Sequence, residues 1–216
     1  MPKGSPELTA TRRAEIIDAC EELYRELPFK DITVGMIAER TTFTRASVYN
    51  YFKTKEEIFL ALLQRDYEQW NATLSSVLEG PELDAEGFAE ALASSLDGRG
   101  QLLKILSMNH YDLEGSSRHE SLVAFKREYG HSLALVEDCL RRFFPNMGGD
   151  ARRDFVYTFF PMMFGIYPYT VVTDTQRIAM SEAGVDFAYA SAHELICASA
   201  LRLLGNGFQS SSIRRV

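Results

Sequence analysis

The sequence has little of what marks several protein classes. It contains three cysteines and one tryptophan among 216 residues, and no apolar run reaches the roughly 18 residues that span a bilayer. Residues 1–13 hold no apolar segment, so we expect no signal peptide and a cytoplasmic location. Cys20, Cys139 and Cys197 are far apart and lack metal-type pair spacing, so we expect small buried side chains rather than a disulfide framework or a zinc site.

Catalytic patterns are equally scarce. His110, His119, His131 and His193 do not share a metal-ligand spacing, and no Ser/His/Asp or Cys/His arrangement is indicated. The acidic pair Glu56–Glu57 stands at a predicted helix start, where the helix dipole favours acids, and it does not read as a catalytic dyad. We therefore predict that the chain is not an enzyme and needs no metal or cofactor.

Helical periodicity is what the sequence has in abundance. Apolar residues make up 46% of the chain, recur three and four residues apart almost throughout, and never read as strands, which predicts an all-α fold. Three N-terminal helices that contain a helix-turn-helix are expected, joined by a long fourth helix to a C-terminal helical domain. We predict one domain over residues 1–58, with Met1–Ser5 as a disordered arm, and a second over residues 59–216.

The predicted helices follow from apolar stripes and from capping residues. Thr33 and Thr44 are expected to cap the second and third helices, Thr54 with Glu57 the fourth, and Ser117 with Glu120 a later one. The helices without a predicted cap cover 11–27, 84–95, 101–107, 151–172, 176–183 and 185–204.

The stretch from Thr33 to Glu57 predicts two short helices joined by a tight turn. The second carries polar side chains that suit a DNA major groove better than a protein core. The net charge of −7 argues against nucleic acid, but residues 41–55 contain three basic residues and no acidic one. Because salt screens charges beyond roughly 8–10 Å, this local potential is what a phosphate would feel. We predict double-stranded DNA binding with modest non-specific affinity.

The same stretch resembles the DNA-binding domain of the TetR family of transcriptional regulators. The matching positions are Thr33, Ile37-Ala38, Thr44, Ser47-Val48-Tyr49-Asn50-Tyr51-Phe52 and Lys55-Glu56-Glu57-Ile58. The resemblance implies a homodimer that pairs through its last two long helices, a near-palindromic operator, and a C-terminal domain that binds a small effector. Repression is the family default.

The turn of the motif departs from the family. The family usually has Ala-Gly there, whereas this chain has Thr41-Thr42. A β-branched residue does not tolerate the positive φ that glycine adopts at little cost. We therefore expect a turn that is either built differently or mildly strained.

Predicted DNA contacts come from the third helix and its flanks. Arg45, Ser47 and Asn50 are expected at base edges or phosphates, and Tyr49 at a phosphate or half-buried in the core. Tyr51 is expected at the DNA backbone or packed inward. Arg12 and Arg13 are expected at a flanking phosphate or in solvent. The full predicted set is Thr33, Thr44, Arg45, Ala46, Ser47, Tyr49, Asn50, Tyr51, Lys53 and Lys55.

A second informative segment, residues 155–169, contains four phenylalanines, three tyrosines and two methionines. Pro161 lacks an N–H group, which predicts a kink. The segment is expected to form either the wall of an apolar effector pocket or core and dimer seam, and alanines in the last helix favour a close seam. Candidates for a pocket that takes a small apolar or aromatic effector are Trp70, His110, Phe125, Tyr129, Tyr157, Phe160 and Phe164. A satisfied surface histidine is the alternative for His110.

The sequence thus predicts a ligand-released transcriptional repressor that binds its operator as a homodimer. The alternative is a helical dimeric ligand-binding or interaction module with little sequence-specific DNA binding.

Overall fold

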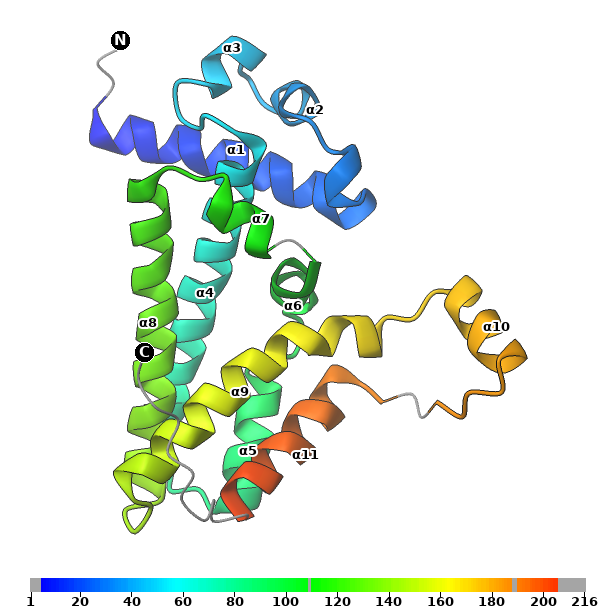
Figure 1. The fold of residues 1–216 in the computed structure, drawn as a ribbon. Coiled ribbons are helices and arrows are strands. Elements are labelled where there is room, and N and C mark those ends of the chain that lie inside the picture. Colours follow the sequence, from blue (N-terminus) through cyan, green and yellow to red (C-terminus); the bar gives the residue numbers. More distant parts are fainter. Residues whose placement is uncertain (1–4, 109, 188–189, 206–216) are drawn as a thin grey trace. The chain divides into compact units, whose positions relative to one another are not determined.

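The computed structural model describes residues 5–108, 110–187 and 190–205, and these form helices without any strand (Figure 1). The predicted all-α class is confirmed. By their internal contacts the described residues divide into two compact units. Among the described residues, the first unit comprises 5–66 with 110–128, and the second comprises 67–108 with 129–187 and 190–205. The predicted domain division at residue 58 stays a prediction.

The first unit contains five complete helical elements and the first part of two long helices. The complete elements are α1 (Pro6–Glu26), η1 (Phe29–Asp31), α2 (Val34–Glu39), α3 (Arg45–Val48) and α7 (His110–Gly115). The long helices are α4 (Lys55–Glu79) and α8 (His119–Phe143). Helices α1, α2, α3 and α4, with the turn after α3, contribute buried side chains to the core of this unit: Ile16, Cys20, Leu23, Ile37, Val48, Phe52 and Phe59.

Local capping accounts for where the N-terminal helices begin. Thr33 accepts a hydrogen bond from the Met36 amide and Thr44 accepts one from the Ser47 amide, both at 3.2 Å, as the sequence predicts. Ser5 caps α1, which begins five residues before the predicted start because Pro6 fits the first helical position. Met1–Gly4 of the predicted arm lie outside the described residues.

The second unit contains the remainder of α4 and α8 and five further helices. These are α5 (Ala85–Ser94), α6 (Gly100–Met108), α9 (Gly149–Thr170), α10 (Asp174–Glu182) and α11 (Ala192–Gly205). Helix α5 packs against α11, and α6 against α9. Helix α9 continues through Pro161, so the kink expected there stays a prediction. No described helix alone is long and apolar enough to cross a bilayer; α9 and α10 together pass that test by length and composition, but they are bent by 84°.

The start of α8 differs from the prediction. Ser117 does not form a capping box with Glu120; its hydroxyl donates to the Leu113 carbonyl at 2.7 Å instead. Helix α7, which the sequence analysis missed, supplies that carbonyl. At the start of α8 the Arg118 amide donates to a carboxylate of α4, that of Glu57.

The start of the last helix was also predicted wrongly. Helix α11 begins at Ala192 rather than at Val185. A capping box sets this start: the Ser191 amide donates to the Glu194 carboxylate at 2.7 Å, and the Glu194 amide donates to the Ser191 hydroxyl at 3.1 Å. Ala190 therefore precedes the helix, and Ala188 lies outside the described residues.

Candidate nucleic-acid interface

Helix α3 and the turn after it form the recognition segment, residues 44–53, and this segment has two distinct faces. Val48 and Phe52 are 0% and 2% exposed and belong to the core. The remaining predicted contacts of the segment are accessible. Thr44, Arg45, Ala46, Asn50 and Lys53 are exposed, while Ser47, Tyr49 and Tyr51 are half-buried. Burying the two apolar residues thus turns the polar side chains of the segment outward.

The accessible side chains of this segment differ in how many hydrogen bonds they form within the protein. The Arg45 Nη2 donates to the Tyr49 hydroxyl at 3.4 Å, and the Thr44 and Ser47 hydroxyls lie 3.0 Å apart. The Asn50 side chain forms no hydrogen bond with any residue that the structure describes. An asparagine can pair with adenine through two hydrogen bonds. Asn50 therefore has its full donor and acceptor capacity available for a base.

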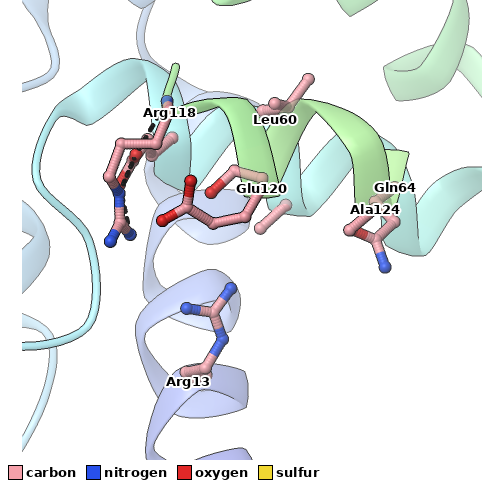
Figure 2. A pocket seen from close by; sticks show the side chains of 9 residues that line it. Arg13, Leu60, Gln64, Arg118, Glu120 and Ala124 are labelled. Atoms are coloured by element: carbon pink, nitrogen blue, oxygen red, sulfur yellow. Dashed lines mark hydrogen bonds and ion pairs between the residues drawn. The ribbon is translucent and has the colours of Figure 1, made fainter. Parts of the chain in front are cut away.

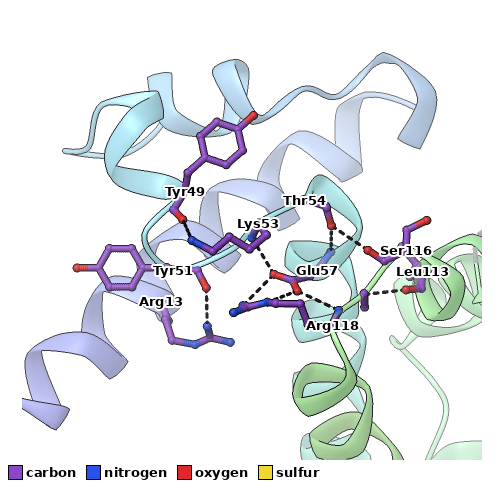
Figure 3. A network of polar contacts seen from close by, with 10 residues as sticks. Arg13, Tyr49, Tyr51, Lys53, Thr54, Glu57, Leu113, Ser116 and Arg118 are labelled. Carbon is purple, nitrogen blue, oxygen red and sulfur yellow. Dashed lines mark hydrogen bonds and ion pairs between the residues drawn. The ribbon is translucent and has the colours of Figure 1, made fainter. Parts of the chain in front are cut away.

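Tyr51 is held against α1. The Arg12 Nη1 donates to the Tyr51 hydroxyl at 3.0 Å. The Arg13 Nη1 donates to the Tyr51 carbonyl at 3.1 Å (Figure 3). Of the two alternatives for Tyr51, this geometry favours inward packing. Both arginines, expected at a flanking phosphate or in solvent, instead fix the end of the recognition segment within the first unit.

Two predicted lysine contacts also have partners. The Lys53 ammonium donates to the Tyr49 carbonyl at 2.9 Å but stays exposed. The Lys55 ammonium donates to the Phe29 carbonyl at 2.8 Å and lies 4.0 Å from the centre of the Phe29 ring. A cation is stabilised by an aromatic face at this distance. Lys55 is thus used to fasten η1, which weakens its expected role at a phosphate.

The Thr41-Thr42 turn is built differently from a glycine turn. No described residue other than glycine has a positive φ. The Thr41 hydroxyl donates to the Ala38 carbonyl at 2.9 Å and accepts from the Phe43 amide at 3.1 Å. The amide and hydroxyl of Thr42 donate to the Glu15 carboxylate at 2.8 and 2.9 Å. Side-chain hydrogen bonds thus replace the left-handed glycine, and Glu15 is a contributor that the sequence analysis missed.

A buried carboxylate lies just behind the recognition segment. Glu57 is 1% exposed, and its Oε2 accepts from the Lys53 amide at 2.7 Å and from Arg118 Nη2 at 3.0 Å (Figure 3). Its Oε1 accepts from the Arg118 amide at 3.1 Å and from Arg118 Nε. The carboxylate therefore joins the turn after α3 to the start of α8.

The electrostatics of Glu57 follow from these partners. Burial raises the pKa of Glu57, but the hydrogen bonds from the Arg118 side chain and from the Lys53 and Arg118 amides outweigh burial, so the pKa lies below its usual value. The Thr54 hydroxyl accepts from the Glu57 amide at 3.1 Å, as a capping box requires. The return bond of the predicted box is absent, because the Glu57 carboxylate accepts from Lys53 rather than from the Thr54 amide.

The predicted effector-pocket residues belong to both units. Trp70, Tyr129 and Phe160 come together in the second, with the Phe160 ring 5.7 Å from each of the other two. Trp70 is fully buried and its Nε1 donates to the Ser95 hydroxyl at 2.9 Å, so it reads as core. Tyr157 is 55% exposed and Phe164 is half-buried. In the first unit the His110 and Phe125 rings lie 6.4 Å apart. An effector pocket made by these residues stays a prediction.

Acidic, histidine and cysteine side chains do not converge on a metal site. Among the residues with described positions, no group of three or more has suitable geometry. Cys20 and Cys139 are buried, as expected, and burial raises the pKa of the Cys139 thiol to about 11, whereas Cys197 is only half-buried.

Comparison with known families matches both parts of the chain. A family model described as "Bacterial regulatory proteins, tetR family" covers residues 16–62. Another, described as "Tetracyclin repressor-like, C-terminal domain", covers residues 64–195, which is more than half of the sequence. The chain belongs to the TetR family. This is a family of transcriptional regulators, which are not enzymes.

Individual TetR-family proteins resemble the chain over shorter stretches. The HTH-type transcriptional repressor Rv1474c of Mycobacterium tuberculosis is 29% identical over 75 residues, which is 35% of this chain and 40% of that protein. The regulator EthR of the same species is 33% identical over 70 residues, 32% of each chain. This chain thus matches less than half the length of these relatives. The crystal structure of FadR from Bacillus subtilis in complex with stearoyl-CoA shares the fold with a TM-score of 0.59 at 17% identity, covering 88% of this chain and 96% of that one.

Proposed function

We propose that this TetR-family chain is a transcriptional repressor that binds a near-palindromic operator as a homodimer and is released by a small-molecule effector. The observation that supports it is the outward polar face of the recognition segment, whose apolar residues Val48 and Phe52 are buried. A helix with such a face fits the major groove, and a two-fold dimer presents two of them to two half-sites.

The effector site is proposed for the C-terminal part of the chain, with a small apolar or aromatic ligand. We place it beside the half-buried Tyr129 and the Phe160 ring, which lie 5.7 Å apart next to the core residue Trp70. Release requires only that the ligand prefers one of two states, since a coupling of about 1–3 kcal/mol changes affinity about 5- to 150-fold.

The alternative function is a helical interaction module with little sequence preference. It gains some support because Arg12, Arg13 and Lys55, three of the N-terminal cations, are engaged within the first unit. Fewer cations then remain for phosphates. The repressor and the module differ in whether DNA binding depends on sequence.

Selection of bound duplexes from a random pool tests the proposal directly. A repressor should enrich one near-palindromic sequence, and its log affinity for that duplex should fall with log salt by about 0.9 per neutralised phosphate. Weak binding without enrichment of any sequence would instead identify the interaction module. Analytical ultracentrifugation at the same protein concentrations should show a homodimer.

Substitution of Asn50 should alter specificity rather than general affinity. Asn50→Ala is expected to relax preference at one operator position, at a cost of about 1–3 kcal/mol if the contact is bidentate. The salt slope should stay unchanged, because asparagine carries no charge. The measurement is repeat selection with the variant, followed by titration of single-base operator mutants.

Lys55→Ala is the variant with which the base preference of Asn50→Ala is compared. Its ammonium binds the Phe29 carbonyl, so this variant should retain the base preference of the unsubstituted chain at every position. If Asn50→Ala weakens binding to all duplexes by the same factor, Asn50 does not read a base.

A further inference from the structure

A pocket of about 240 Å³ opens within the first unit between α1, α4 and α8 (Figure 2). Leu60, Ala61 and Ala124 give it an apolar wall, and Arg13 and Arg118 bring two guanidinium groups to it. Sites for drug-sized ligands usually measure about 300–1,000 Å³. This pocket therefore suits a smaller molecule.

The charge of Arg13 is only partly balanced by its neighbours. It is half-buried, stacks with its guanidinium carbon 4.2 Å from the centre of the Phe52 ring, and donates Nη1 to the Tyr51 carbonyl. No carboxylate among the described residues forms an ion pair with it. Burial lowers the pKa of Arg13, and the nearby Arg118 charge lowers it further, while Glu57 opposes the shift only in part.

Arg118, unlike Arg13, has a carboxylate partner. It is already paired with Glu57, and this pair contributes little net charge. The first turn of α8 adds a favourable potential for anions, since Glu120 and Ser121 of that turn line the pocket and backbone N–H groups are unpaired at a helix N-terminus. The site thus combines a half-buried cation lacking a carboxylate partner, a second guanidinium group and a helix start.

We propose that this pocket binds a small organic anion with one carboxylate on a short apolar body. The carboxylate pairs with Arg13 on the side facing Arg118, and the body lies against Leu60, Ala61 and Ala124. Binding gives the half-buried Arg13 guanidinium a carboxylate partner, and hydrogen bonds between two charged groups are stronger than those between neutral ones. The site belongs to the first unit and is separate from the effector pocket proposed above.

Glu120 is expected to lower the affinity of the pocket for an anion. Its carboxylate is exposed and lines the same pocket, as Figure 2 illustrates. Like charges repel, so Glu120 weakens the binding of an anion. Glu120→Gln, which keeps the size and removes the charge, should bind the anion more tightly than the unsubstituted chain.

Calorimetric titration of the full chain with benzoate, without DNA, tests the site. Benzamide is the matched neutral ligand of the same shape, and benzoate is expected to bind at least about tenfold more tightly. Arg13→Gln, which removes the cation, and Ala124→Leu, which fills the pocket, should each lower benzoate affinity about tenfold or more. Arg127→Gln is the control, since it makes the same charge change on α8 at an exposed residue outside the pocket.

Three results would overturn the proposal: equal binding of benzoate and benzamide, no binding of either, or unchanged benzoate affinity in Ala124→Leu. If Arg13→Gln fails to fold, Ala124→Leu and Glu120→Gln still decide the matter, because neither disturbs the bond to Tyr51. Since DNA is absent from this titration, its outcome is independent of whether the chain selects an operator.

Discussion

Phe160→Ala is expected to lower the free energy of unfolding by about 3–5 kcal/mol, the usual cost of removing a buried aromatic ring. Phe160 is 1% exposed, and its ring lies 5.7 Å from those of Trp70 and Tyr129 and 5.8 Å from that of Phe159. Truncation leaves a void that these rigid rings do not readily fill. Urea unfolding followed by circular dichroism measures the effect.

The control is another aromatic residue of the same helix. Tyr157 is 55% exposed, so Tyr157→Ala should change stability by less than about 1 kcal/mol. The comparison also separates the two interpretations of the aromatic segment. If Phe160→Ala is as mild as Tyr157→Ala, the interpretation of Phe160 as a core residue is contradicted.

Glu57→Gln is expected to cost about 2 kcal/mol at pH 7, the scale of hydrogen bonds to a charged group. The variant keeps an oxygen that can accept from the Lys53 amide but loses the charge that holds the Arg118 side chain. Because folding lowers the pKa of Glu57, its carboxylate stabilises the protein at pH values above the unfolded pKa of about 4.3. This contribution is lost as the pH falls through the folded pKa.

The difference in unfolding free energy between the unsubstituted chain and Glu57→Gln should therefore be largest near neutral pH and should shrink in acid. Glu56→Gln is the matched control, because Glu56 is half-buried and carries the same charge one residue earlier. It should cost less than about 0.5 kcal/mol. A difference for Glu57→Gln that is the same at every pH would show that the carboxylate is not stabilised by its charge.

Features that depend on neighbours in the sequence were predictable. Thr33 and Thr44 cap helices three residues before the amides they bind, and such local pairs leave a readable pattern. The outward face of α3 follows from apolar residues four positions apart, Val48 and Phe52. The Ser191–Glu194 box was equally local, but the sequence analysis placed the start of the last helix at Val185 and did not identify the box.

Features that depend on distant partners were not predictable. Glu57 and Arg118 are 61 residues apart, and nothing in either neighbourhood specifies the other. The same holds for Glu15 and Thr42, which are 27 residues apart and replace the expected glycine turn. Ser117 was assigned a cap because its local pattern fits one, yet a tertiary carboxylate takes the amide of Arg118 instead. Tertiary contacts determine these three features, and the periodicity of the sequence carries no information about such contacts.

The described residues of the first unit come from two stretches of chain, 5–66 and 110–128, which are separated by part of the second unit. A fragment cut after Asp66 would lack Arg118, so the Glu57 carboxylate would lose its ion pair and the hydrogen bond from the Arg118 amide. Such a fragment should be far less stable than the full chain, although it contains the complete helix-turn-helix. A chimaera that is meant to carry the recognition segment therefore has to include both stretches. A chimaera that takes only the chain up to a junction within α4 would lack Arg118.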